Sequence, residues 1–448
     1  MFWLAWSRGV MQVLSFATTL LVARILMPAD YGVMALASVW TESVGMVAEM
    51  GLGAAIIQFR DLDRQEIDTC FWITMTLATA GWAVLSLSAP MIASWFGVQR
   101  LAQVLPVLAL VLPLTCCRVV SDSLLRKRLA LDRVSQAEVL GGLAALPVML
   151  GCALAGFGVW TLVVGGLLAP TVRSAATVAF APWCPGFRLG GKRANEVLHF
   201  SLATLGTRVL WVLRERADEL IVGKLSGQVV LGFYAMGKEL ACLPGTKIST
   251  VVNTLASPIM AELQTNIAGM RAAFYRAVRL TVAITLPTSA GMALVADEMI
   301  AVLLGPKWLP SVSLLRLLCL YAAVRSIDVL LPPVLFARRR ERFLFWYFFA
   351  QLIVVPAAAV LGALWGGAQG LIVFFTPVYC AVMAIMAKEA LAEMRATISE
   401  LWSEIWPIVG ATAVMAAVLV LTRELTLAGQ SEPAWVVLVL LSTSGAVA

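Results

Sequence analysis

Long apolar runs, separated by short polar breaks, follow one another along this entire chain. A helix that crosses a membrane needs about 20 mostly apolar residues. Fourteen segments fit this pattern, and they cover residues 3–26, 33–57, 67–96, 102–125, 135–156, 159–181, 197–222, 229–255, 273–303, 311–336, 343–365, 367–387, 405–427 and 433–448. The pattern predicts an all-α fold, a polytopic membrane helix bundle of about 14 transmembrane helices, with no room for a folded domain between them.

Composition supports the membrane class and excludes several kinds of function. Hydrophobic residues make up 61% of the 448 residues and charged residues only 13%, whereas a soluble domain is about a quarter charged. The chain has one histidine, no Cys-x-x-Cys pair and no Gly-x-x-x-x-Gly-Lys-Ser/Thr phosphate-binding motif. We therefore expect no metal site, no cofactor, no disulfide framework and no ATP hydrolysis.

The loops alternate in charge when the N-terminus is placed in the cytoplasm. Most loop Lys and Arg residues then fall on the inner side, namely Arg60, Arg64, Arg126, Lys127, Arg128, Arg133, Arg188, Lys192, Arg193, Arg271, Arg276, Arg338, Arg339, Arg340, Arg342, Lys388 and Arg395. The outer loops hold Arg100, Lys224, Lys307 and Arg423. Cytoplasmic loops carry the excess of positive charge, so the alternation predicts a cytoplasmic N-terminus. It also accounts for the formal net charge of +7, and nucleic acid is not an expected partner.

A repeat with an offset of 200 residues links the two halves of the chain. The stretch around Arg8 aligns without a gap with the stretch around Arg208, and Gly32 then falls on Gly232. The segment 28–32 in the first stretch predicts a short turn outside the membrane, and the second helix is expected to begin at residue 33.

A second correspondence supports the repeat. With a slightly larger offset, Arg118 and Asp122 in the fourth helix match Arg325 and Asp328 in the tenth. Six helices separate equivalent positions, so both halves cross the membrane in the same direction, as in transporters built from parallel repeats. We expect two pseudo-symmetric six-helix lobes, residues 1–190 and 191–395, followed by two additional helices in residues 396–448. The alternative is chance similarity among apolar helices.

Several stretches resemble one known family. They are VARILMPADYG followed by VMALA, AEMGLGAAIIQ at residues 48–58, DELIVGK at residues 218–224 followed by LGFYAMGKEL, and FGVWTLV from Phe157. Together they are similar to the polysaccharide flippases, the polysaccharide-transporter branch of the multidrug/oligosaccharidyl-lipid/polysaccharide exporter superfamily. Two features depart from the family: the segment before the first helix is unusually short, and the stretch RERADEL is more charged, with Asp218 its one matching position.

The resemblance implies a non-enzymatic transporter with two six-helix lobes and alternating access. Its implied cargo is an undecaprenyl-pyrophosphate-linked oligosaccharide, which is moved from the cytoplasmic to the outer leaflet of a bacterial inner membrane for surface or exopolysaccharide biosynthesis. The implied partners are this lipid-linked oligosaccharide, membrane lipids and a polysaccharide polymerase.

Cations inside the predicted helices are candidate ligands for the pyrophosphate. A charge at the bilayer centre costs roughly 2.5 to 3.5 kcal/mol, so such residues should face a wet cavity, where Arg and Lys can replace the hydration of a phosphate. The candidates for substrate binding are Arg8, Arg208, Lys247, Arg118, Arg325 and Lys238. The alternative is ion pairing within a helix, as the spacings Arg118–Asp122, Arg325–Asp328 and Arg214–Asp218 allow. Arg8, Arg208 and Lys247 have no acidic residue three or four positions away, although Arg8 could extend to the nearby membrane surface.

Acidic residues inside the helices are candidates for coupling to a proton or sodium gradient. These are Glu42, Glu49, Asp218 and Asp328. The alternative for Glu42 is that it permanently neutralises an arginine in the cavity.

Three functions remain open from the sequence. The leading one is the flippase. The second is an ion-coupled multidrug or metabolite exporter of the same superfamily, which predicts a more acidic and aromatic cavity. The third, an integral-membrane polysaccharide polymerase or ligase, would need a substantial outer loop, and the predicted outer loops are a few residues each.

Overall fold

The structure is a computed structural model that describes residues 2–49, 52–53, 56, 59, 62–187, 190 and 194–429. The side chains of residues 2–10, 12–13, 194–209, 211, 250–251, 253–255, 257 and 425–429 lie outside this description. Every regular element in the described ranges is a helix. The chain forms two compact units, unit 1 (Met1–Gly232) and unit 2 (Phe233–Ala448).

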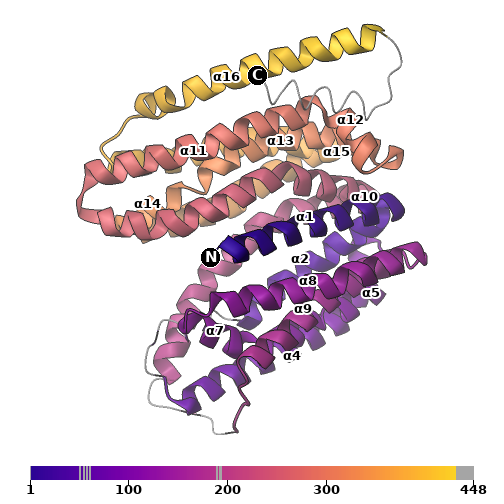
Figure 1. Cartoon of the computed structure of the whole chain (residues 1–448), viewed down its shortest axis with the longest axis vertical. Coiled ribbons are helices and arrows are strands. Elements are labelled where there is room, and N and C mark those ends of the chain that lie inside the picture. The colour runs from indigo at the N-terminus through magenta and orange to yellow at the C-terminus, as the bar shows by residue number, and fades with distance from the viewer. Residues whose placement is uncertain are drawn as a thin grey trace. The chain divides into compact units, whose positions relative to one another are not determined.

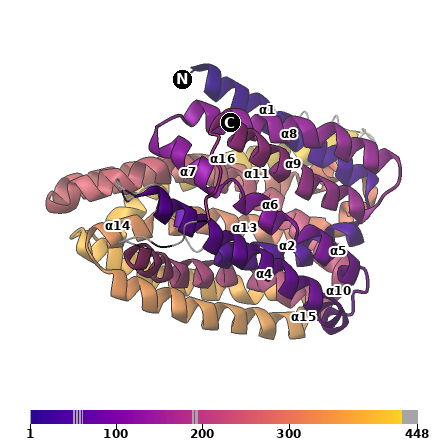
Figure 2. The same ribbon diagram turned by 90° about the horizontal axis from the view of Figure 1, so that it is seen from below.

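Unit 1 is a bundle of long and short helices (Figure 1). They are α1 (Phe2–Ile25), α2 (Pro28–Glu49), α4 (Arg64–Phe96), α5 (Leu101–Leu108), α6 (Val111–Cys116), α7 (Val119–Lys127), α8 (Leu131–Leu154), α9 (Val159–Phe180) and the first part of α10 (Ala194–Glu262). Helix α8 packs against both α1 and α9, whereas α4 packs against α2, α5 and α6. Figure 2 shows α8 and α9 side by side from a second direction.

Unit 2 contains the rest of α10 and the later helices. These are η1 (Leu263–Thr265), α11 (Ile267–Leu294), α12 (Ala296–Leu303), η2 (Pro306–Ser311), α13 (Val312–Asp328), α14 (Leu331–Ala337), α15 (Glu341–Glu393) and α16 (Ile398–Gly429). Helix α11 packs against α13 and α16, and α15 packs against α13 and α14. Buried residues such as Phe274, Leu331 and Met386 form its largest described core.

The polytopic helical architecture predicted from the apolar runs is confirmed. Within the described ranges, seven helices are long and apolar enough to cross a membrane, or eight if the bent pair α5–α6 and α7 forms one span. Helices α10 and α15 each contain two predicted spans, because the chain turns at Gly227 (φ 83°) and at Gly366 and Gly367 without a longer loop. The last predicted span, residues 433–448, lies outside the described residues.

Prolines explain two breaks inside predicted spans. The segment predicted as one helix, residues 102–125, is divided into α5, α6 and α7. A proline ring clashes with the carbonyl four residues earlier, and the first break, at Ala109, lies four residues before Pro113. The break between α13 and α14 includes Val329, four residues before Pro333.

The hairpin between α1 and α2 corrects one prediction. The segment 28–32 was expected to be an external turn, but α2 begins at Pro28. Proline suits the first helical position because that N–H has no partner within a helix. One carboxylate oxygen of Asp30 accepts a hydrogen bond from the Met27 backbone N–H at 3.1 Å, and the other lies 3.4 Å from Arg100 Nη1. This stretch is therefore a buried first helical turn.

Two glycines at the predicted offset of 200 make a reciprocal contact inside unit 1. A Cβ atom at Gly32 would lie 1.8 Å from the carbonyl oxygen of Gln228, and one at Gly232 would lie 1.9 Å from that of Pro28. Real Cβ contacts do not reach such distances. The first turn of α2 and the turn of α10 after Gly227 therefore cross with backbone against backbone, and only glycine fits at either position.

Further backbone features recur at similar offsets in the two units. Leu129 (φ 57°) and Arg339 (φ 55°) each follow a short helix. Each is followed by the same hydrogen bond of 2.9 Å, from Ala130 N to Leu125 O and from Arg340 N to Leu335 O. Gly158 and Gly367 have nearly equal φ and ψ values as well. These similarities support the parallel repeat, and the division into lobes 1–190, 191–395 and 396–448 stays a prediction.

Ion pairs hold the loop between α14 and α15 against the end of α15. Arg338 Nε lies 3.1 Å and Arg340 Nε 2.6 Å from the carboxylate of Glu393. The hydrogen bond to Glu393, together with the charges of Glu393 and Glu389, raises the pKa of Arg340 above the ordinary arginine value.

Helix α16 is bound to the rest of unit 2 near both ends. Arg279 Nε of α11 donates to Glu404 Oε2 at 3.0 Å near the start of α16. Near its other end, Arg423 lies 2.8 Å from Asp297 and 3.1 Å from Glu298 of α12. Helix α16 is thus an integral part of unit 2.

Candidate functional site

A cavity inside unit 1 contains two arginines. It has a volume of about 680 Å³ and lies among α1, α6, α8 and α9. Its polar lining comes from Ser15, Thr115, Arg118, Glu138 and Arg173. A cavity of this size holds many water molecules, so it can solvate charged groups within an otherwise apolar bundle.

Arg118 reaches this cavity because the helix is interrupted there. It caps the start of α7 directly after the break that follows α6. Arg118 Nη1 lies 3.8 Å from Asp122 Oδ1, which agrees with the alternative of ion pairing at four-residue spacing, and a substrate-binding role for Arg118 stays a prediction. Asp122 also accepts a hydrogen bond from Arg126 Nε at 2.6 Å. Across the cavity, Arg173 Nη1 lies 3.5 Å from Glu138 Oε1.

A second charged group of unit 1 links α2 with α10. Arg216 Nη2 lies 2.7 Å from Glu42 Oε2, and Arg216 Nη1 lies 2.9 Å from Glu219 Oε1. The Glu42 side chain is 51% exposed and that of Glu219 only 4%. This geometry agrees with the alternative in which Glu42 neutralises an arginine, and a coupling role for Glu42 stays a prediction.

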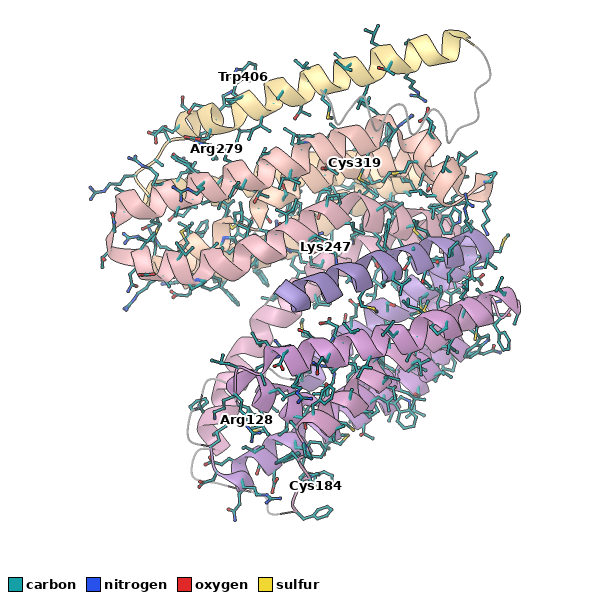
Figure 3. All side chains as sticks on the ribbon, in the orientation of Figure 1. Arg128, Cys184, Lys247, Arg279, Cys319 and Trp406 are labelled. Carbon is teal, nitrogen blue, oxygen red and sulfur yellow. The ribbon has the colours of Figure 1, made fainter. Side chains whose placement is uncertain are left out.

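Unit 2 contains three further predicted cations. Lys247 is exposed on α10 (Figure 3). The ammonium of Lys238 lies 6.0 Å from the centre of the Tyr234 ring. Arg325 is half-buried on α13, with Nη1 3.8 Å from Cys242 Sγ.

Asp328 is a buried acid at the last position of α13. Its Oδ2 accepts a hydrogen bond of 2.6 Å from the phenol of Tyr379, which comes from α15. The Tyr379 ring packs edge-on against Tyr321 at a centroid distance of 5.1 Å. The predicted pairs Arg325–Asp328 and Arg214–Asp218 stay predictions, and Arg214 Nη2 lies 2.5 Å from the neighbouring Glu215.

Of the remaining predicted residues, Asp218 is fully described, whereas Arg8, Arg208 and Glu49 lie at or beyond the limits of the described part. The helix at Arg8 and Arg208 is described, but their side chains lie outside the described part. Glu49 is the last residue of α2, and Asp218 is half-buried on α10. Among the side chains that the structure describes, the lining of the unit 1 cavity includes one predicted ligand, Arg118.

Sequence reasoning missed Arg173, Glu138 and Arg216. Arg173 lies inside the apolar run 159–181, so the rule that selected Arg118, a cation within a predicted helix, could have selected it too. Arg216 could have been weighed as the arginine that Glu42 neutralises, but no spacing rule joins residues 174 positions apart.

The chemistry of the described residues is that of a polar, cationic cavity. In the described ranges, no three His, Cys, Asp or Glu side chains are grouped so that they could hold a metal ion. All eight cysteines are free thiols.

Comparison with known proteins identifies the family of this chain. Residues 21–313, more than half of the chain, match the family described as polysaccharide biosynthesis protein. The chain is similar to lipopolysaccharide biosynthesis protein WzxC of Escherichia coli, with 23% identity over 83% of this chain and 76% of the relative. It is also similar to succinoglycan biosynthesis transport protein ExoT of Rhizobium meliloti, with 22% identity over 79% of this chain and 72% of the relative.

Solved structures share the fold. The inward closed conformation of the lipid II flippase MurJ superposes with a TM-score of 0.78 and 11% identity, covering 100% of this chain and 98% of that one. At this identity the similarity concerns the fold alone. The match to the family profile over most of the chain is decisive, and the chain belongs to the family of polysaccharide biosynthesis proteins.

Proposed function

We propose that this protein is a flippase that moves an undecaprenyl-pyrophosphate-linked oligosaccharide across the bacterial inner membrane by alternating access. The observation that carries the proposal is the cavity of about 680 Å³ that contains Arg118 and Arg173 within a membrane-spanning bundle. The names of relatives in lipopolysaccharide and succinoglycan biosynthesis support a polysaccharide cargo.

The cavity chemistry suits an anionic, sugar-bearing cargo. Among the described residues that line the cavity, Arg118 and Arg173 outnumber the single carboxylate, Glu138. When their ion-pair neighbours Asp122 and Arg126 are counted as well, three arginines face two carboxylates, so the described charges sum to a net positive value. Guanidinium groups replace the hydration of phosphate oxygens with paired hydrogen bonds. Glu138, Ser15 and Thr115 offer hydrogen-bonding groups for sugar hydroxyls. A cationic drug would instead meet like charges.

The finer parts of the proposal concern orientation and coupling. The distribution of basic loops supports a cytoplasmic N-terminus. Among the coupling candidates, we favour Asp328, because it is buried and joins α13 to α15 through Tyr379. Binding of a proton or sodium ion there would alter a contact between two helices. A polysaccharide polymerase that takes up the flipped product is the expected partner.

The test is a flipping assay with the full chain in proteoliposomes. The probe is a fluorescent undecaprenyl-pyrophosphate oligosaccharide, and its arrival in the opposite leaflet is measured by quenching with an impermeant reagent. Arg118→Gln should slow flipping about 10- to 100-fold, since a hydrogen bond to a charged group contributes about 1.5–3 kcal/mol and about 1.4 kcal/mol corresponds to a factor of ten.

Arg128→Gln is the matched control, because Arg128 is exposed beyond the end of α7 (Figure 3). It should flip the probe at the normal rate. Normal flipping by Arg118→Gln would remove the cavity arginine from the mechanism, and absence of flipping by the unmodified protein would refute the function.

A further inference from the structure

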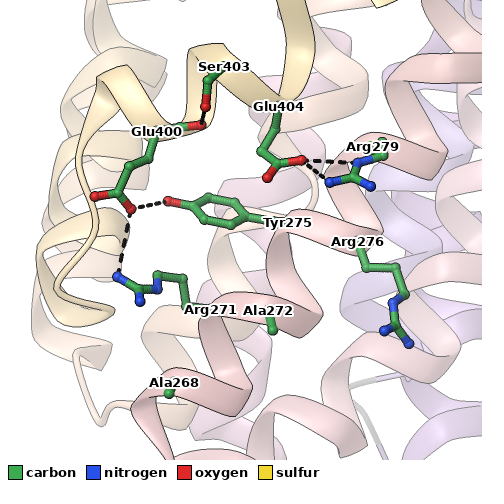
Figure 4. Close-up of a pocket in the computed structure, with 9 residues that line it drawn as sticks. All are labelled: Ala268, Arg271, Ala272, Tyr275, Arg276, Arg279, Glu400, Ser403 and Glu404. Carbon is green, nitrogen blue, oxygen red and sulfur yellow. Dashed lines mark hydrogen bonds and ion pairs between the residues drawn. The ribbon is translucent and has the colours of Figure 1, made fainter. Parts of the chain in front are cut away.

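A second polar cleft lies between α11 and α16 in unit 2, apart from the cavity described above (Figure 4). It has a volume of about 510 Å³. The side chains that carry its chemistry are Arg271, Tyr275, Arg276, Arg279, Glu400 and Glu404. The small residues Ala268 and Ala272 on α11 leave the space open.

The cleft lies at the depth of a lipid headgroup. After Glu404, α16 has no charged residue from Ile405 to Thr422, which at about 1.5 Å per residue spans about 27 Å, close to the hydrocarbon thickness of about 30 Å. On α11, Arg279 is likewise the last charge before the apolar run 280–294.

Exposed tryptophans mark the same depth. Trp402 and Trp406 are 54% and 58% exposed, and both lie on the segment of α16 that forms the cleft. Tryptophan is enriched at the boundary between hydrocarbon and headgroups. The Arg279–Glu404 pair therefore lies at this boundary, with the rest of the cleft on its polar side.

The charges of the cleft do not balance. Glu400 accepts a hydrogen bond from the Tyr275 phenol at 3.1 Å and lies 3.7 Å from Arg271. Glu404 is bound by Arg279. In the part of the chain that the structure describes, Arg276 makes no hydrogen bond or ion pair, and Figure 4 shows its guanidinium directed away from both glutamates. Three arginines against two glutamates leave one positive charge, and it is exposed.

We propose that this cleft binds the phosphate of an anionic membrane phospholipid, and that Arg276 is the cation that contacts it. Phosphates of each leaflet lie at this depth, and basic pockets between membrane helices are suited to anionic headgroups. Two of the cleft arginines are engaged by carboxylates, so the third supplies the attraction for an anion. This site is independent of the cargo cavity in unit 1.

The experiment measures phosphatidylglycerol binding to the full chain in phosphatidylcholine nanodiscs. Added phosphatidylglycerol should raise the Tm of the unmodified protein, and native mass spectrometry should detect the retained lipid. Arg276→Gln should weaken this binding about 10-fold or more, the effect of losing one charge-assisted contact. Arg342→Gln, which removes an exposed arginine outside the cleft, should bind phosphatidylglycerol normally.

A second variant tests whether weaker binding by Arg276→Gln reflects the lost positive charge and not misfolding. Ala272→Glu changes an exposed lining residue and places a carboxylate four residues before Arg276, where it can neutralise the guanidinium. It should weaken binding as Arg276→Gln does. The proposal is overturned if either variant binds phosphatidylglycerol like the unmodified protein, if Arg342→Gln binds as weakly, or if phosphatidylcholine alone or soluble glycerol phosphate gives the same rise in Tm.

Discussion

Two segments at similar positions in the two units share a backbone turn and differ in how they use an aspartate. Both segments end in a residue with positive φ, Leu129 in unit 1 and Arg339 in unit 2. Asp122 lies between Arg118 and Arg126 on its own chain segment, one turn away on each side.

The second aspartate has a partner on another helix. Asp328 accepts its hydrogen bond from the Tyr379 phenol of α15, 51 positions away in sequence. Its side chain is also more buried than that of Asp122, which is 16% exposed. The turn is thus retained, but the two aspartates lie at different places before it: Asp122 is inside α7 and stabilises its own segment, whereas Asp328 ends α13 and joins two helices. At this turn, the two units share a backbone conformation and differ in side-chain chemistry.

The largest expected effect tests the backbone crossing at the two repeat-related glycines, Gly32 and Gly232. Gly32→Ala and Gly232→Ala should each lower the yield of folded protein severely, because the new Cβ would lie under 2 Å from a carbonyl oxygen, and overpacking costs about 1–3 kcal/mol or more. The measurement is monomer recovery in size-exclusion chromatography after membrane extraction.

Gly151→Ala is the control for these glycines. A Cβ at this position of α8 meets nothing within 4 Å, so alanine should stabilise the helix by about 0.5–1 kcal/mol. If one of Gly32 and Gly232 tolerated alanine and the other did not, the inference that both glycines are required by the backbone crossing of α2 and α10 would be wrong.

The next effect separates the two aspartates. Asp328→Ala should lower the free energy of unfolding by about 1–3 kcal/mol, because it leaves a buried phenol without its acceptor. Asp122→Ala should cost less, about 1 kcal/mol or below, because Arg126 is 42% exposed and Arg118 lines a cavity that admits water. Thermal unfolding of both variants in one detergent provides the comparison, and equal losses would contradict it.

A smaller effect tests the partner of Asp328. Tyr379→Phe keeps the ring against Tyr321 and removes only the hydroxyl, so it should cost about 1 kcal/mol. In a double-mutant cycle with Asp328→Ala, the two losses should be non-additive by about 0.5 kcal/mol or more. Additive losses would mean that the hydrogen bond contributes no stability.

The smallest effect returns to the shared turn. Leu129→Gly and Arg339→Gly should each leave the free energy of unfolding unchanged or raise it by at most about 1 kcal/mol, because glycine adopts positive φ without steric strain. Both changes should have the same sign. A clear loss at one position alone would show that its side chain, and not the turn, is what matters there.

Sequence periodicity and composition predicted the helices well where a span is continuous. The predicted segment 159–181 corresponds to α9, Val159–Phe180, because the hydrophobic requirement of the bilayer acts on each helix separately. The predicted start of the second helix was wrong, because proline occurs both in turns and at the first position of a helix. Pro28 begins α2 instead of forming an external turn. Segment 102–125 was predicted as one helix, although Pro113 interrupts it.

The site was predictable only as far as local spacing reaches. The pair Arg118–Asp122 follows from four-residue spacing on a helix. The contacts of Glu42 with Arg216 and of Asp328 with Tyr379 join separate helices. They depend on how the helices pack, which a single sequence does not specify.

The ion pairs that hold α16 also set an order of events during synthesis. Arg279 and Asp297 are made 125 and 126 residues before their partners Glu404 and Arg423. At about 5–20 residues per second, these charges wait roughly 6–25 s in a nascent chain before α16 emerges. Throughout that interval, the charges on α11 and α12 need water, lipid headgroups or the insertion machinery as temporary partners. Helix α16 therefore completes the ion pairs of a unit that began to assemble long before it.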